Sequence, residues 1–230
     1  RRPSDVGFSD DGFVLPPIDY APLMIESSTP PEGMLFPMLS GGIGGRLKAR
    51  RSTVADRVEA AADLIRSNPG PWVVWCGLND EGRDLASALN GDVVVIEGKT
   101  PDHEKIEREL RWRAEGTPRV LITKPKIFGF GMNWQYCAQV MFLGIGDSYE
   151  QYYQAVRRCW RFGQTQPVNV VIVTSDLEVH VLDNVKRKEE QVSKMIDGIV
   201  TGMRDFETAE IGGQKRDASV YTESDARGSG

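Results

Sequence analysis

Three arginines gather in a short stretch of the sequence, at positions 157, 158 and 161. Apolar periodicity and a capping box predict one helix over residues 148–163, which places Arg158 and Arg161 three positions apart on one face. Two guanidinium groups aimed the same way would form a fork for phosphate oxygens. The alternative is that the arginines complement the negative carboxyl end of that helix and stay in solvent. Taken alone, such a cluster favours this second interpretation.

Two glycine-rich segments resemble nucleotide-binding loops but lack required features. The Gly-Lys-Thr sequence at 98–100 could end a P-loop, but GxxxxGK[ST] needs a glycine where the chain has Val93. The glycines within 41–45 have no strand before them and no apolar helix directly after them, which favours a hinge. The sequence has no Walker lysine and no nucleophile visibly paired with either histidine. The chain by itself therefore does not have the residues of a complete enzyme.

Composition and charge exclude several classes of protein. The 230 residues are 40% hydrophobic and 27% charged, with a net charge of -5, which argues against a polybasic nucleic-acid binder. No apolar run approaches the ~20 residues that a bilayer crossing needs. The three cysteines and two histidines lie far apart, so they predict neither a zinc site nor a disulfide framework. We expect a cytoplasmic protein with no metal site of its own and no membrane partner.

Strand and helix signals alternate from residue 52 to about residue 203. Short buried-type apolar runs are separated by amphipathic segments, a pattern typical of strands that are linked by helices. The sequence therefore predicts an α/β fold with an open, mostly parallel sheet of about five or six strands and helices on both faces. The strands predicted from the apolar runs cover residues 72–76, 92–96, 119–123, 138–143 and 168–173.

The flanking segments differ in composition from this region. Residues 1–51 hold seven of the thirteen prolines, which predicts an extended Pro/Gly-rich connector with room for a short hairpin. Because the chain opens with Arg1 and not methionine, we expect it to continue a longer protein. Residues 52–203 are predicted as the folded domain, ending in a long helix over 176–203. Residues 204–230 are predicted as a flexible tail.

Two segments resemble helicase motifs. The sequence QAVRRCWRFGQ at 154–164 resembles motif VI of superfamily-two helicases, and most closely the Swi/Snf-type form QxxGRxxRxGQ. GFGMN at 129–133 resembles the motif V segment GxGxN, at the end of the third predicted strand. The resemblance covers about residues 52–203, and SYEQYYQ at 148–154 is similar to phage or prophage versions. It departs from the family at Arg157, where glycine is usual, and at Pro125, where a small hydroxyl residue is usual.

The resemblance implies that the predicted sheet has a RecA-like fold, and it implies roles for residues on both motifs. In this family, ATP and Mg²⁺ are held mainly by a separate first RecA-like domain, and the second domain supplies arginines. Arg161 would then be the arginine finger, Arg158 its partner on the phosphates, and Gln154 the neighbour that positions them. Gly131 and Asn133 would approach the nucleotide ribose and the arginines, and Gly129 belongs to the same nucleotide-binding segment.

Nucleic-acid contacts are expected on the loop that follows the third predicted strand. Lys124 and Lys126 lie there and could meet the phosphate backbone, although two exposed loop lysines could equally serve solubility. The favoured partner is DNA, bound without sequence preference.

Three classes of function remain open. The leading one is the C-terminal motor domain of a nucleic-acid-dependent ATPase, either a helicase or a translocase, that does not hydrolyse ATP without its first domain. The second is a stand-alone nucleic-acid-binding or protein-binding module with a RecA-like fold and no catalysis. The third is a small-molecule enzyme with its site at the carboxyl ends of the strands, where the sequence reveals no acid–base pair.

Overall fold

The structure is a computed structural model, and its described residues include most of the region between 50 and 176. The chain divides into two units, residues 2–186 and residue 1 with 187–230. Every element named below lies in the first unit. The predicted tail 204–230 and most of the predicted helix 176–203 lie outside the described residues. The described ranges are 9, 14–26, 50–114, 118–127, 132–144, 146, 148–176, 187–188, 190–191 and 194–195.

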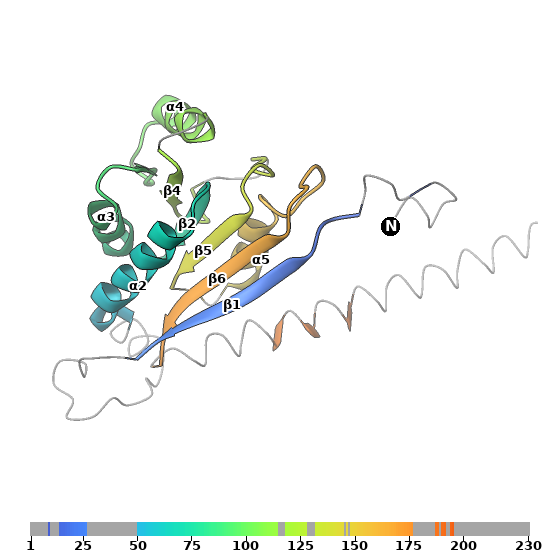
Figure 1. Cartoon of the computed structure of the whole chain (residues 1–230), viewed down its shortest axis with the longest axis horizontal. Helices are drawn as coiled ribbons and strands as arrows, with labels where there is room; N and C mark the ends of the chain where they lie inside the picture. The colour runs from blue at the N-terminus through green and yellow to red at the C-terminus, as the bar shows by residue number, and fades with distance from the viewer. Residues whose placement is uncertain are drawn as a thin grey trace, which may run out of the picture. The chain divides into compact units, whose positions relative to one another are not determined.

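Six strands form one open sheet in the order β1-β6-β5-β2-β4-β3 (Figure 1). Every neighbouring pair is parallel, which confirms the fold class predicted from the sequence. The strands β3 and β4 lie on one side of β2, and β5 and β6 lie on the other side. The strand order therefore reverses at β2. The strands are β1 (Ile18–Ile25), β2 (Trp72–Cys76), β3 (Val93–Val95), β4 (Val120–Thr123), β5 (Gln139–Leu143) and β6 (Val168–Ser175).

Helices cover both faces of the sheet, because its central strands are apolar on both sides. All five residues of β2 are buried, and successive side chains point to opposite faces. Val73 and Trp75 join one apolar core, whereas Trp72 and Val74 join the other. The helices α4 and α5 pack on the first core, and α2 and α3 pack on the second. The helices are α2 (Val54–Ser67), α3 (Asn79–Ala88), α4 (Asp102–Arg113) and α5 (Tyr149–Val156).

Part of the predicted connector 1–51 belongs to the sheet. Residues 18–25 form β1, which runs parallel to β6 along its whole length, from Ile18 beside Val168 to Ile25 beside Ser175. Most of its side chains are exposed, so the apolar alternation that marks a strand is weak. Its Pro22 is acceptable because β1 is an edge strand, where one row of N–H groups has no strand to bind. The prediction of an extended connector is therefore wrong for residues 18–25, which form a strand of the sheet.

A buried ion-pair network ties α2 and α3 to the end of β2. Glu81 of α3 is fully buried and accepts from Arg57 Nη1 at 2.8 Å and from Arg50 Nε at 3.0 Å. It also accepts the backbone N–H groups of Gly77 and Leu78, both at 2.9 Å. These donors compensate for the cost of taking the carboxylate out of water.

The charge of Glu81 also makes the fold sensitive to acid. Burial by itself raises the pKa of this carboxyl, but Arg50 and Arg57 outweigh burial and hold the pKa below its ordinary value. Because the pKa is lower in the folded state, the ionised form stabilises the fold above the unfolded value of about 4.3. That contribution is lost as the pH falls through the folded-state pKa.

We expect Glu81→Gln to lower the free energy of unfolding by about 3–5 kcal/mol at neutral pH, because it leaves buried guanidinium charge uncompensated. The difference from wild type should shrink below about pH 4, where the carboxyl of unfolded chains protonates. Asp63→Asn is the matched control, since it weakens the exposed pair with Arg66 (2.8 Å) and should cost at most about 1 kcal/mol. Urea denaturation of both variants measures this, and equal losses would contradict a dominant role for the buried network.

Candidate functional site

The three arginines lie on a turn and not on a helix. α5 ends at Val156, and residues 157–164 continue as a series of turns. We call residues 157–164 the arginine turn. The prediction of one helix over 148–163 is therefore wrong beyond Val156, and so is the argument that Arg158 and Arg161 share a helical face.

The helix stops because its next carbonyl groups bind other partners. The carbonyl of Arg158 accepts the N–H of Trp134 at 2.9 Å. The carbonyl of Cys159 accepts from the side-chain amide of Gln164 at 3.3 Å. In a continuing helix, these two oxygens would accept N–H groups four residues further along. Gly163 then takes φ = +91°, a left-handed conformation that favours glycine, and the chain turns toward β6.

Gln164 closes the arginine turn from within. Its side chain is buried, and Nε2 also donates to the carbonyl of Cys137 at 3.1 Å. Its Oε1 accepts the N–H groups of Thr165 and Gln166, both at 2.9 Å. All of the polar capacity of this amide is therefore used to fix backbone groups on both sides of the turn. The last glutamine of the motif VI pattern thus has a structural role here.

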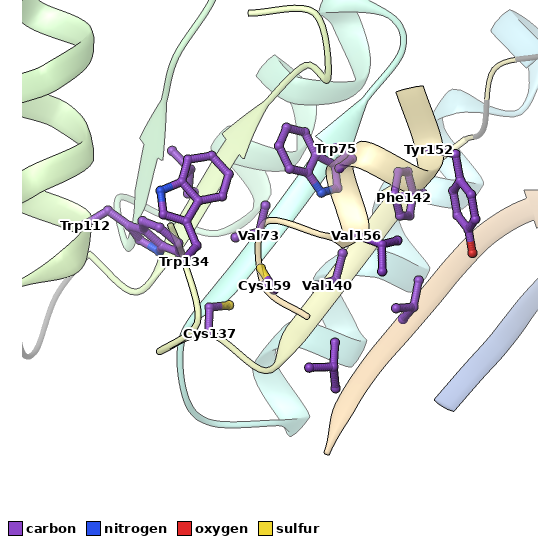
Figure 2. Close-up of a cluster of buried hydrophobic side chains, with 14 of the residues drawn as sticks. Val73, Trp75, Trp112, Trp134, Cys137, Val140, Phe142, Tyr152, Val156 and Cys159 are labelled. Carbon is purple, nitrogen blue, oxygen red and sulfur yellow. The ribbon is translucent and has the colours of Figure 1, made fainter. Parts of the chain in front are cut away.

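Arg158 is the buried arginine of the turn, with 7% of its surface exposed. Its guanidinium carbon lies 5.8 Å from the ring centroid of Trp75 and 5.9 Å from that of Trp134. The two indoles are stacked on each other, with centroids 5.6 Å apart (Figure 2). Burial lowers the pKa of this guanidinium from its ordinary value, but an arginine keeps its charge in a protein. The two rings offer the buried cation favourable cation–π contacts.

Arg161 and Arg157 are less buried than Arg158. The side chain of Arg161 is half-buried, and Nη1 donates to the carbonyl of Met132 at 3.5 Å, a long hydrogen bond. Its neighbour Phe162 is 61% exposed, so this end of the turn faces solvent. Arg157 lies over the ring of Trp160, with its guanidinium carbon 5.1 Å from the centroid. Arg157 and Arg161 are therefore both partly accessible to solvent, whereas Arg158 is buried.

The remaining predicted nucleotide-site residues are only partly described. Gln154 Nε2 donates to Glu150 Oε1 at 3.3 Å, so this hydrogen bond links it to its own helix and not to either arginine. Asn133 is exposed on the segment that precedes Trp134. Gly129 and Gly131 lie outside the described residues, and their predicted role stays a prediction.

Lys124 and Lys126 line a hollow of about 270 Å³ at the carboxyl ends of β2, β4 and β5. Lys124 is half-buried and Lys126 is exposed. The hollow also contacts Trp75 and, at the start of α5, Ser148. The strand connections change direction at β2, and ligands of open α/β sheets bind at such a point. The structure thus places both predicted lysines where this sheet could receive a ligand.

Sequence reasoning missed the residues that hold the arginine turn. Trp134 and Trp75 contact Arg158, and the indole N–H of Trp160 donates to the carbonyl of Pro16 at 2.8 Å, just before β1. The available signal was the unusual number of tryptophans, five in 230 residues. A buried indole carries an N–H group that usually finds an acceptor, and four of the five tryptophans donate one here, namely Trp72, Trp112, Trp134 and Trp160.

Two further features, a metal site and a membrane-spanning helix, are absent from the described part of the chain. Within the described ranges, no cluster of three or more His, Cys, Asp or Glu side chains is arranged to hold a metal ion. Among the same residues, no helix combines the length and the apolar character that a bilayer crossing requires.

Comparisons with known proteins agree with this architecture. Residues 56–163, just under half of the chain, match the family described as helicase conserved C-terminal domain. Among solved structures, the chain is similar to the C-terminal part of the Fun30 ATPase domain, with 18% sequence identity and a TM-score of 0.51. That match covers 56% of this chain and 44% of that chain, and it shows a RecA-like α/β fold. No curated protein sequence matches at a significant level. Together, these findings show that residues 56–163 are similar to helicase C-terminal domains and that the fold is RecA-like.

We expect Gln164→Leu to destabilise the domain by at least about 2 kcal/mol, since each buried polar group left without a partner costs about 1–3 kcal/mol. The change keeps a similar volume but removes the hydrogen bonds to Cys137 and Cys159. Gln166→Leu is the matched control, because that side chain is exposed and the change should stay within about 0.5 kcal/mol. Thermal and chemical denaturation compare the two. If Gln164→Leu were as harmless as the control, the side chain would not be what closes the turn.

Proposed function

We propose that this chain contains the second motor domain of a nucleic-acid-dependent ATPase, a helicase or translocase. The match of residues 56–163 to the helicase C-terminal family carries this proposal. ATP, as the substrate, and Mg²⁺ would bind mainly to a separate first RecA-like domain, because this sequence has no P-loop lysine. The chain alone would then release no phosphate from ATP.

The proposed chemical contribution of this domain is positive charge from the arginine turn. Phosphoryl transfer needs stabilisation of charge on the transferring group more than covalent help from the protein. Arg161 is the proposed finger because its half-buried guanidinium stands beside the exposed Phe162. Arg158 is its proposed partner on the phosphates, held in one orientation by the two indoles. The proposed role of Gln154 is to position the two arginines, and its side chain hydrogen-bonds Glu150 on the same helix.

The proposed grip on nucleic acid lies at the hollow beside β2. Lys124 and Lys126 are the cations that line it, and the amino-terminal end of α5 adds the positive end of a helix dipole at Ser148. Such contacts bind the phosphate backbone of any sequence, which a protein that moves along a strand requires. DNA is the proposed nucleic acid.

Finer assignments also remain proposals. The spacing of Gln154, Arg158, Arg161 and Gly163 supports a Swi/Snf-type motif VI, and the sequence at 148–154 supports a phage or prophage source. The proposed location is the cytoplasm, in keeping with three buried free cysteines.

Arg161→Ala tests the proposed function in the protein that also contains the first domain. We expect turnover of ATP to fall by roughly 10²- to 10⁴-fold, because an arginine finger acts on charge that develops during transfer. Binding of ATP in the ground state should weaken far less, since the first domain holds it. Steady-state phosphate release and nucleotide titration measure the two effects, and the melting temperature should stay close to wild type.

Arg157→Gly is the matched control for this experiment. It removes a neighbouring guanidinium that is stacked on Trp160 and restores the residue usual in motif VI, so turnover should change little. If both variants kept near-wild-type turnover, Arg161 would not be an arginine finger and the proposed chemical contribution of the arginine turn would be contradicted. The alternative of a binding module without catalysis would then be favoured.

The double variant Lys124→Ala and Lys126→Ala tests the proposed grip. We expect weaker DNA binding for all sequences and a flatter dependence of affinity on salt, by a slope of about one for each lost phosphate contact. Lys99→Ala with Lys105→Ala is a control of equal charge change, because both lysines lie away from the hollow and pair with Glu97 and Asp102. Fluorescence anisotropy over a range of salt concentrations measures both, and an unchanged slope would leave the lysines with a role in solubility only.

A further inference from the structure

Trp134 contacts Arg158 in two independent ways. Its backbone N–H donates to the carbonyl of Arg158 at 2.9 Å, and its ring centroid lies 5.9 Å from the guanidinium carbon. The first contact fixes the backbone of the arginine turn, and the second fixes the direction of the side chain. The ring is fully buried, so it has a defined position from which to act.

A buried carboxylate of α4 holds Trp134 in turn. The indole N–H of Trp134 donates to Glu109 Oε1 at 2.8 Å, and Glu109 is only 3% exposed. Trp112, also on α4, meets the ring of Trp134 edge to face with centroids 5.5 Å apart (Figure 2). Arg113 lies 3.6 Å from the same carboxylate and partly balances its charge. The orientation of this indole is therefore set by a charge-assisted hydrogen bond as well as by packing.

We propose that Trp134 is a positioning residue for the arginine pair, and that Glu109 sets its orientation. The inference rests on the proposed function, because it assigns the arginines a task that depends on their orientation. Preorganised charges stabilise a transition state most effectively, and a displacement near 1 Å can cost about 10²-fold in rate. Trp134 itself touches no reacting group. It acts by holding Arg158. Met132, two residues before it in the chain, has the carbonyl that accepts the hydrogen bond from Arg161, so one backbone segment contacts both arginines.

The first measurement uses the 230-residue chain and needs no activity. The Nε–H signal of Arg158 in a ¹⁵N-edited NMR spectrum should be displaced by the ring currents of the two indoles, and its loss in Arg158→Lys assigns it. Trp134→Leu should move the signal toward the position of exposed arginines. Trp72→Leu is the matched control, since it removes a buried indole and its hydrogen bond to the carbonyl of Asn68, but it lies in the core on the opposite face of the sheet. An unmoved signal in Trp134→Leu, or an equal movement in both variants, would overturn the proposal.

The second measurement uses the protein that also contains the first domain. We expect kcat to fall by about 10-fold in Trp134→Phe and about 10²-fold in Trp134→Leu, with the KM for ATP changed less than about threefold. Trp72→Phe and Trp72→Leu should keep kcat within about twofold at temperatures well below their melting points. If either leucine variant fails to fold, the values of kcat in Trp134→Phe and in the phenylalanine control variant are compared instead. Equal losses of kcat in that pair would reduce Trp134 to a structural role and overturn the proposal.

The two measurements separate failure of this inference from failure of the proposed function. A wild-type protein that does not turn over ATP would contradict the proposed function, and the NMR signal would still report whether Trp134 orients Arg158. A protein that turns over ATP but shows the same kcat in Trp134→Leu as in wild type would keep its function and overturn the role of Trp134.

Discussion

The burial of one guanidinium group constrains the structure around the arginine turn. An arginine charge taken out of water is costly unless the protein provides compensating contacts, and Arg158 is only 7% exposed. Trp75 comes from β2 and Trp134 from the segment before β5, so the cation joins two separate parts of the chain. The backbone also leaves the helical conformation here, because the carbonyl of Arg158 accepts the N–H of Trp134 and cannot accept a helical N–H group. The end of the helix and the shape of the turn both result from this arrangement.

The parallel sheet could be predicted from the sequence for a simple physical reason. A strand buried on both faces shows as an unbroken apolar run. Both WVVWC at 72–76 and VVIV at 170–173 are too short and too rich in β-branched or aromatic residues to favour a helix. The connections between such strands need amphipathic segments, and those show a period of 3.6 residues. β1 has no such apolar run, because most side chains of this edge strand are exposed. Only its pairing with β6 in the structure identifies it as a strand.

The arginine turn was harder to predict, because long-range contacts override the local pattern. Residues 148–163 have helical periodicity, and helical propensity is a weak indication when tertiary contacts compete with it. The competing groups are the N–H of Trp134 and the amide of Gln164, which take the carbonyls of Arg158 and Cys159. Glu81 illustrates the same limit, since no local pattern in α3 indicates that its carboxylate binds two arginines from the segment around α2.

Trp75 links the two regions to which chemistry has been assigned. Its ring lies beside the guanidinium of Arg158, and the same residue lines the hollow with Lys124 and Lys126. Packed interiors transmit displacements because they contain few voids, so a ligand that shifts this indole must also disturb the environment of the arginine. Energetic coupling between two sites passes through elements that both sites can bias, and Trp75 at the end of β2 is in contact with both regions.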